Sequence, residues 1–343
     1  MPNHNSDIDN DGMVSGEKVF TGFVSGLTFK NKSVQYTVVD GLAIFEGDII
    51  LGSAEEMAAH TEAILSGKAD ALKDDLQKGV AITGAQYRWP NALMPYEIDP
   101  SLPNKNRVTD AIAHWTSSTN LSFVQRTASN ASQYPNYVRF RPAENVCSSS
   151  IGMRGGQQFI NLSSGCSTGN TIHEIGHAWG LWHEQSREDR DSRVTIHWEN
   201  IESGKEHNFN QHISDGDDYG SYDYGSIMHY SSKAFSKNDK NTITTIPSGI
   251  AIGQRNGLSN GDIATIHAIY TTWHTHKTVI QVYATYHEQN AWAHIQDLGW
   301  RKIKTGNPDG VTNMLIALSE AKANNRTTNV YADGSTIERV YLN

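Results

Sequence analysis

Residues 173–183 read His-Glu-Ile-Gly-His-Ala-Trp-Gly-Leu-Trp-His, which sets three histidines, one glutamate and one glycine at fixed spacings. On a helix, His173 and His177 are four positions apart and therefore share one face, where two imidazoles can reach one metal ion. Gly180 can adopt positive φ, so the chain can leave the helix there and bring His183 back as a third ligand. The pattern predicts a helix, a sharp turn and a three-histidine zinc site.

Three protein ligands leave one zinc position open, as in catalytic zinc sites. Water can fill that position, and zinc lowers the pKa of the water toward about 7. Glu174 stands beside the histidines and can take a proton from the water as a general base. The alternative is a chance run among fifteen histidines, but five fixed positions coincide by accident at a rate on the order of one in ten thousand. The run therefore predicts a hydrolase with one Zn²⁺ ion.

Stretches on both sides of the histidine run carry a family resemblance. They are Trp89-Pro90, His183-Glu184-Gln185-Ser186-Arg187-Glu188-Asp189-Arg190-Asp191, Ser226-Ile227-Met228-His229-Tyr230 and Gly253-Gln254-Arg255-Asn256-Gly257-Leu258-Ser259. Together they resemble the astacin family of metzincin zinc metalloendopeptidases, over about residues 80–271. The resemblance implies an α+β fold: a two-lobed catalytic domain with a cleft between a lobe that holds a sheet and the zinc helix, and a less regular C-terminal lobe.

The resemblance also implies roles for individual residues. His173, His177 and His183 would bind zinc, and Glu174 would pass a proton from water to the leaving amine. Met228 would form a hydrophobic floor below the metal.

Two further residues have roles that depend on the same resemblance. The hydroxyl of Tyr230 would stabilise the oxyanion that develops on the scissile carbonyl. Glu184 would meet the amino terminus that activation frees. The alternatives are core packing for Met228 and Tyr230 and a solvated surface charge for Glu184.

Residues 1–79 resemble the propeptide of a latent enzyme. Within them, Phe45-Glu46-Gly47-Asp48 resembles the motif by which astacin zymogens place an aspartate on zinc. Asp48 would be this latch, since a carboxylate is an acceptable zinc ligand; the alternative is an ordinary Gly-Asp turn. A helix is expected from Ser53, as N-cap, toward Gln77, with Gly67 as a potential break. Activation would need a protease that cleaves near residues 78–80.

Composition restricts the partners. The formal charge is -9, and the chain has no basic stripe of the kind that phosphate binding needs, so nucleic acid is excluded as a partner. No run of 18 apolar residues exists to span a membrane. The resemblance to the astacin family implies protein or peptide substrates.

The cysteines and the N-terminus bear on localisation. Cys147 and Cys166 have a spacing similar to one astacin disulfide, which implies an oxidising compartment; the alternative is two free thiols. The N-terminus shows neither the basic nor the apolar region of a conventional signal peptide. We expect a secreted or extracytoplasmic protein, although the export route stays open.

Two other regions give structural expectations. The stretch Gly155–Leu162 alternates weakly and reads as a strand near the cleft, either an edge strand that binds an extended peptide or one more sheet strand. Residues 272–343 read as a small α+β module, with strands, one helix from Val311 to Ala323, and core packing as the default for Trp292 and Trp300.

The sequence thus predicts three parts: residues 1–79 as N-terminal tail and inhibitory propeptide, 80–271 as an astacin-like catalytic domain, and 272–343 as an accessory module. The expected function is a zinc-dependent endopeptidase made as a latent zymogen. The alternative is a catalytically silent zinc-containing binding protein that acts through its C-terminal module. Against it, every catalytic position of the motif holds a competent residue.

Overall fold

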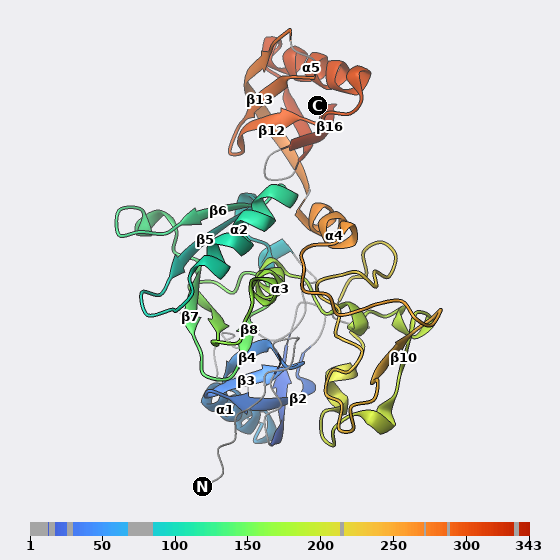
Figure 1. Ribbon diagram of the computed structural model, residues 1–343. Helices are drawn as coiled ribbons and strands as arrows, with labels where there is room; N and C mark the ends of the chain where they lie inside the picture. The colour runs from blue at the N-terminus through green and yellow to red at the C-terminus, as the bar shows by residue number, and fades with distance from the viewer. Residues whose placement is uncertain are drawn as a thin grey trace. The chain divides into compact units, whose positions relative to one another are not determined.

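The computed structural model describes residue 13 and residues 18–25, 30–67, 85–212, 216–270, 272–286, 289–332 and 336–343 (Figure 1). The predicted cleavage region at residues 78–80 lies outside these described residues. None of the described helices combines the length and apolar composition that crossing a membrane requires.

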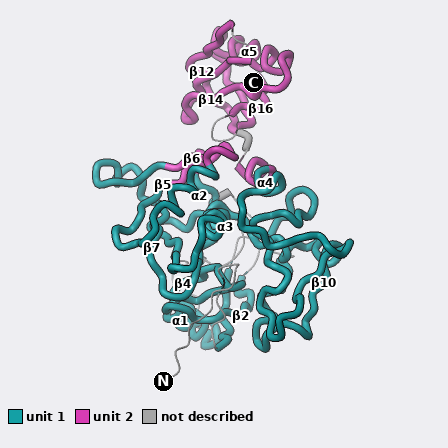
Figure 2. The backbone as a smooth tube through the Cα atoms, viewed as in Figure 1, with its two compact units in different colours: residues 1–89, 95–115, 124–263 teal, residues 90–94, 116–123, 264–343 magenta. Residues whose placement is uncertain are grey.

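The chain divides into two compact units, which we describe separately (Figure 2). The first comprises residues 1–89, 95–115 and 124–263, and the second residues 90–94, 116–123 and 264–343. The first unit thus holds both the N-terminal segment (residues 13–67) and most of the predicted catalytic domain. The three-part division drawn from the sequence stays a prediction.

The N-terminal segment is an antiparallel meander followed by one helix. Its elements are β1 (Val19–Val24), β2 (Lys32–Val39), β3 (Leu42–Phe45), β4 (Ile49–Ser53) and α1 (Ala54–Leu65). Ser53 caps α1 as expected: its hydroxyl accepts from the Glu56 N–H, and the Glu56 carboxylate accepts from the Ser53 N–H. Met57 turns inward from the helix into a core shared with the strands. The helix ends just before Gly67, and the rest of the predicted helical stretch lies outside the described residues.

One mixed sheet of nine strands joins this segment to the rest of the first unit. Its order is β1-β2-β3-β4-β8-β9-β7-β5-β6. The additional strands are β5 (Leu93–Ile98), β6 (Ser122–Gln125), β7 (Tyr137–Pro142), β8 (Cys147–Ser149) and β9 (Gln157–Leu162). Strand β4 pairs in parallel with β8, at Ile49 and Ser149. The reading of residues 155–162 as an edge strand is therefore wrong: β9 lies inside the sheet, because β8 covers one side of it and β7 the other.

Two helices pack against each other in this part of the chain, and the second of them also contacts β8 and β9. They are α2 (Asn106–Ser118) and α3 (Thr168–Trp179). The Trp115 indole of α2 is buried and donates to the Ile172 carbonyl of α3, at 3.1 Å. The expected disulfide is present, and it ties Cys147 of β8 to Cys166, just before α3. These contacts fix the start of α3 against the sheet.

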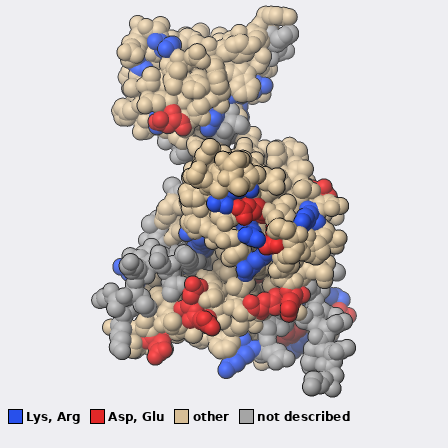
Figure 3. All heavy atoms as spheres, turned by 90° about the vertical axis from the view of Figure 1, so that its left-hand side faces the viewer, with Lys and Arg blue, Asp and Glu red and all other residues tan. Residues whose placement is uncertain are grey.

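The rest of the first unit is less regular, as expected. It holds one two-stranded sheet, β10 (Val194–Ile196) with β11 (Ile243–Thr245), and the start of α4 (Asn260–Tyr270). Its core contains both aliphatic and aromatic side chains: Val194, Ile201, Phe209, Tyr230, Phe235 and Ile243. On the face drawn in Figure 3, basic and acidic side chains of the described residues are interspersed, without a continuous basic stripe.

The C-terminal part of the second unit is a closed barrel with one helix, which is α+β as expected. The barrel order is β12 (Thr272–Ala284), β13 (Ala291–Ile295), β14 (Gly299–Ile303), β16 (Thr336–Leu342) and β15 (Thr327–Ala332), and α5 spans Pro308–Ala323. Core packing for Trp300 is wrong: its side chain is 44% exposed. Alternation in β13 and β14 turns small and aliphatic residues inward, among them Ala293 and Ile303, so Trp300 faces out and Trp292 is half-buried.

Candidate metal centre

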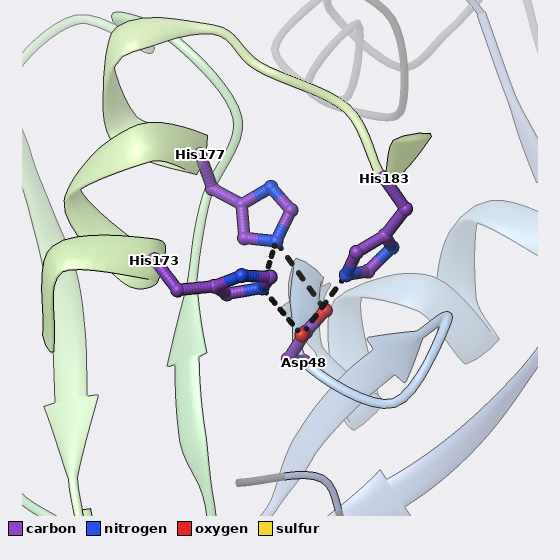
Figure 4. Close-up of side chains that lie close together, drawn as sticks. All are labelled: Asp48, His173, His177 and His183. Atoms are coloured by element: carbon purple, nitrogen blue, oxygen red, sulfur yellow. Dashed lines mark hydrogen bonds and ion pairs between the residues drawn. The ribbon is translucent and has the colours of Figure 1, made fainter. Parts of the chain in front are cut away.

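Helix α3 and the turn after it gather three histidines. Ser167 caps the start of the helix, where its hydroxyl accepts from the Asn170 N–H at 3.1 Å. Gly180 ends the helix with φ of 109°, a left-handed conformation that glycine adopts without steric cost. The turn brings His183 back toward His173 and His177, and Figure 4 shows the three imidazoles converging on one point. The predicted helix, turn and convergence are all present, and all three histidines are fully buried.

Each imidazole is held by a partner at its other nitrogen. The Nδ1 of His173 lies 2.8 Å from the Ile227 carbonyl, and the Nδ1 of His177 lies 2.8 Å from the Leu181 carbonyl. The Nδ1 of His183 lies 2.9 Å from a carboxylate oxygen of Glu46. Carbonyl and carboxylate oxygens accept hydrogen bonds and do not donate them. Each Nδ1 therefore carries the proton, and each Nε2 presents its lone pair to the centre.

Asp48 of the N-terminal segment completes the group. Its Oδ2 is 3.1 Å from the Nε2 atoms of both His173 and His183, and its Oδ1 is 3.5 Å from the Nε2 of His177. One ligand atom from each of the four residues lies within 4.8 Å of the others. Three neutral imidazoles with aligned lone pairs and one carboxylate suit zinc, so these residues fit the ion that the motif implies.

Burial and neighbouring charge shape the protonation of this group. Burial would raise the pKa of Asp48, but His183 and His177 hold it well below its usual range. Burial would lower the pKa of His183, but the carboxylates of Asp48 and Glu46 raise it to about 9. For His173 burial prevails and lowers the pKa to about 3.

Glu174 lies on the same helix, one position after His173. Its carboxylate is fully buried, and neither oxygen has a hydrogen-bond partner among the described residues. Burial, followed by the negative charge of Asp48, raises its pKa well above the usual range. A buried carboxyl with a raised pKa and unused oxygens beside a metal site is suited to accept and return a proton.

The predicted residues downstream of the helix lie around the same centre. Met228 packs its sulfur so closely on Gly176 of α3 that a Cβ there would be 2.7 Å away. Tyr230 is fully buried, and its ring lies 4.6 Å from that of His183, between centroids. Its hydroxyl donates to the Glu46 carbonyl at 2.7 Å. The structure thus brings both residues to the metal centre.

Glu184 is mostly buried and has no catalytic contact. Its Oε1 accepts from the Asp223 N–H at 2.7 Å, and the Arg187 guanidinium is 3.6 Å away. Burial raises the pKa of Glu184 to about 8, although the bond from Asp223 and the charge of Arg187 oppose the shift. Its predicted partner, the amino terminus freed at residues 78–80, lies outside the described residues, so this role stays a prediction.

Comparisons with known proteins agree with the geometry. The model of the peptidase family Astacin matches residues 81–271. The chain belongs to the astacin family. The fold is accordingly that of an astacin-like metzincin, and His173, His177 and His183 form its site for one catalytic zinc ion.

The relatives of this astacin include named zinc proteases. It is 36% identical to zinc metalloproteinase nas-15 of Caenorhabditis elegans over 66% of this chain and 39% of the relative. It is 34% identical to zinc metalloproteinase nas-13 of the same organism, over 71% of this chain and 52% of the relative. The chain therefore spans about two-fifths to one half of the length of these relatives. Among solved structures, it is similar to high choriolytic enzyme 1 of Oryzias latipes, a hatching enzyme zinc-protease, with 34% identity, 55% of this chain and 98% of that chain covered, and a TM-score of 0.49.

Sequence reasoning missed two residues of this astacin's site. Glu46 is fully buried and reaches His183, and His212 is buried beside it, with its Nε2 2.6 Å from the other Glu46 oxygen. Glu46 stood in the quoted motif next to the aspartate and could have been found there. His212 has no local sequence signal, because its role depends on contact with a residue 166 positions earlier.

Proposed function

We propose that this astacin is a zinc-dependent endopeptidase that is made as a latent zymogen with residues 1–79 as its propeptide. Asp48 is the latch, and cleavage near residues 78–80 by an activating protease releases it. The observation that carries the proposal is the position of the Asp48 carboxylate, 3.1 Å from two of the three histidine Nε2 atoms. Close to it is the Glu174 carboxylate, which has no hydrogen-bond partner in the described part of the chain. Because the chain spans only part of the length of its matched relatives, its substrates and partners are also proposals.

The latch acts at more than one place. Asp48 occupies the position that a water or a substrate carbonyl would need, which blocks access to the histidines. The same segment engages the hydroxyl of Tyr230 through the Glu46 carbonyl. Gly47, between these two residues, has φ of 81°, and a Cβ there would lie 2.7 Å from the Phe235 ring. Only glycine lets the segment pass this point and deliver Asp48 to the histidines.

Removal of the propeptide would prepare the centre for catalysis. A bound zinc ion would polarise the scissile carbonyl and lower the pKa of water. Glu174 would take a proton from the attacking water on its carboxylate and deliver it to the leaving amine nitrogen. Departure of Asp48 removes a negative charge that raises the pKa of Glu174, so the carboxylate becomes a better acceptor. The released Tyr230 hydroxyl would then donate to the developing oxyanion.

The substrates would be proteins or peptides, and the enzyme would work in an oxidising compartment. The disulfide between Cys147 and Cys166 supports a secreted or extracytoplasmic location. After activation, Glu184 would bind the new amino terminus. The positive charge of the amino group would offset the free-energy cost of burying the Glu184 carboxylate.

The test is casein hydrolysis by the full chain, before and after limited trypsin nicking. We expect activity only after cleavage near residue 78, and its loss with 1,10-phenanthroline and in the Glu174→Ala variant. A correctly cleaved, zinc-loaded protein without activity toward casein or a peptide library would contradict the proposal.

The latch has its own test in the Asp48→Asn variant. Because an amide binds zinc more weakly than a carboxylate, we expect this variant to hydrolyse casein before cleavage, at least about tenfold faster than uncleaved wild type. The control is Glu55→Gln, an exposed position in the first turn of α1. Equal latency of Asp48→Asn and the control would rule out the aspartate latch.

A further inference from the structure

We propose that Glu46 is a second carboxylate of the latch: it positions the zinc ligand His183 and thereby tightens the metal centre while the propeptide is attached. This inference depends on the proposed zymogen, since Glu46 belongs to the same propeptide as Asp48. It differs from the aspartate latch because Glu46 contacts the outer nitrogen of a ligand instead of the position of the metal.

Both oxygens of the Glu46 carboxylate are hydrogen-bonded to residues that lie outside the propeptide. One oxygen lies 2.9 Å from the Nδ1 of His183. The other lies 2.6 Å from the Nε2 of His212 and accepts from the Ser186 hydroxyl at 3.2 Å. The residue is fully buried. A buried carboxylate with three hydrogen-bond donors is a strong and directional contact, which holds the His183 ring in one orientation.

The three zinc ligands differ in where their outer partners come from. His173 and His177 donate to the carbonyls of Ile227 and Leu181, both of which stay in the enzyme after activation. The outer partner of His183 comes from the propeptide and leaves with it. Outer partners of metal-bound histidines fix the ring and raise its basicity, so their loss weakens metal binding. The latent form should therefore hold zinc more tightly than the mature form.

The backbone of Glu46 gives independent support. Its φ is 48°, in the left-handed region that glycine and asparagine occupy most readily. A glutamate in this conformation costs about 1 kcal/mol, and such strain persists where other contacts offset it. Here the offsetting contacts are those of the side chain with His183, His212 and Ser186. A glycine would suit the backbone better but would forfeit all three.

The experiment measures zinc release from the uncleaved full chain into excess chelator. Wild type is compared with Glu46→Gln, Glu46→Gly and the control Glu62→Gln, an exposed position on α1. We expect release from both Glu46 variants to be about tenfold faster than from wild type, with the control unchanged. After cleavage and removal of the propeptide, all four samples have the same mature sequence, so their release rates should become equal.

Two outcomes would overturn the inference. One is equal release from wild type and Glu46→Gln. The other is a Glu46→Gly variant with a higher unfolding midpoint and an unchanged rate of zinc release, because this would mean that the residue affects only the backbone conformation. If Glu46→Gln does not fold, the zinc release of Glu46→Gly tests the inference by itself. The casein activity of uncleaved Asp48→Asn is read separately. If uncleaved Asp48→Asn is active and the Glu46 variants release zinc at the wild-type rate, only the role of Glu46 is refuted. If uncleaved Asp48→Asn is latent, the aspartate latch itself is refuted.

Discussion

At the scale of single residues, His229 shows how burial fixes protonation next to the metal centre. Its Nδ1 donates to the Tyr230 carbonyl at 2.7 Å, and its Nε2 accepts from the Tyr222 hydroxyl at 2.6 Å. Burial, with a smaller contribution from the charge of Arg255, lowers the pKa of His229 to about 4, although its bond to Tyr230 opposes this. The folded chain therefore keeps this imidazole neutral where an unfolded chain would protonate it.

This difference predicts a pH dependence of stability. Between the unfolded pKa of about 6.5 and the folded value of about 4, the unfolded chain binds more protons, so stability falls as the pH falls through this window. The Glu46 and Asp48 contacts stay intact in His229→Gln, which cannot take up this proton. We expect its unfolding free energy to fall less steeply than that of wild type, by up to about 1.4 kcal/mol per pH unit. Urea unfolding at several pH values from about 4 to about 7 measures this, and parallel curves would contradict it.

At the scale of elements, the sequence predicted what local spacing controls. The position of α3, its end at Gly180 and the return of His183 follow from residues within one short run. The cap of α1 at Ser53 was equally local. The interior position of β9 was not accessible, because it depends on β8, whose three residues are too few to show an alternating pattern. The prediction for Trp300 was wrong because the alternation of a strand does not show which of its two faces is buried. In the barrel, the smaller side chains occupy the inner face.

Helix α4 holds the turn that carries Met228 and Tyr230. The Asp262 carboxylate, in the first turn of this helix, accepts from the Ser226 hydroxyl at 2.6 Å and from the Ile227 N–H at 3.0 Å. The Ile227 carbonyl in turn accepts from the Nδ1 of His173. An element outside the zinc helix therefore positions a zinc ligand through two hydrogen bonds in series.

Removing this carboxylate should destabilise the whole first unit. In wild type, the Ser226 hydroxyl and the Ile227 N–H each donate to one oxygen of Asp262. In Asp262→Asn, an amide NH₂ replaces one of these oxygens, so one buried donor loses its acceptor. We expect the unfolding free energy to fall by about 2–4 kcal/mol, measured by urea denaturation. The matched control is Asp309→Asn, the same change at an exposed position in the first turn of α5, with an expected effect within about 0.5 kcal/mol. Equal effects of the two changes would refute the proposed support of the turn.

At the scale of the whole molecule, each part has its own core. The buried core of the barrel is formed entirely by residues between Val279 and Ile337. The three histidines and Asp48, with strands β4, β8 and β9, all belong to the first unit. A ligand stabilises only the cooperative unit that binds it, because the binding free energy is lost only when that unit unfolds.

Heating the full chain should therefore give two calorimetric transitions, of which only one responds to zinc. Chelation with 1,10-phenanthroline should lower the midpoint of the first unit by at least about 5 °C, since loss of about 2 kcal/mol or more shifts a unit of this size by that amount. The barrel transition should stay in place. It can be assigned independently by Leu318→Ala, which leaves a cavity in the barrel core and should lower only that midpoint. If chelation shifts both midpoints equally, the two cores unfold as one, and the C-terminal barrel is then energetically part of the first unit instead of a separate module.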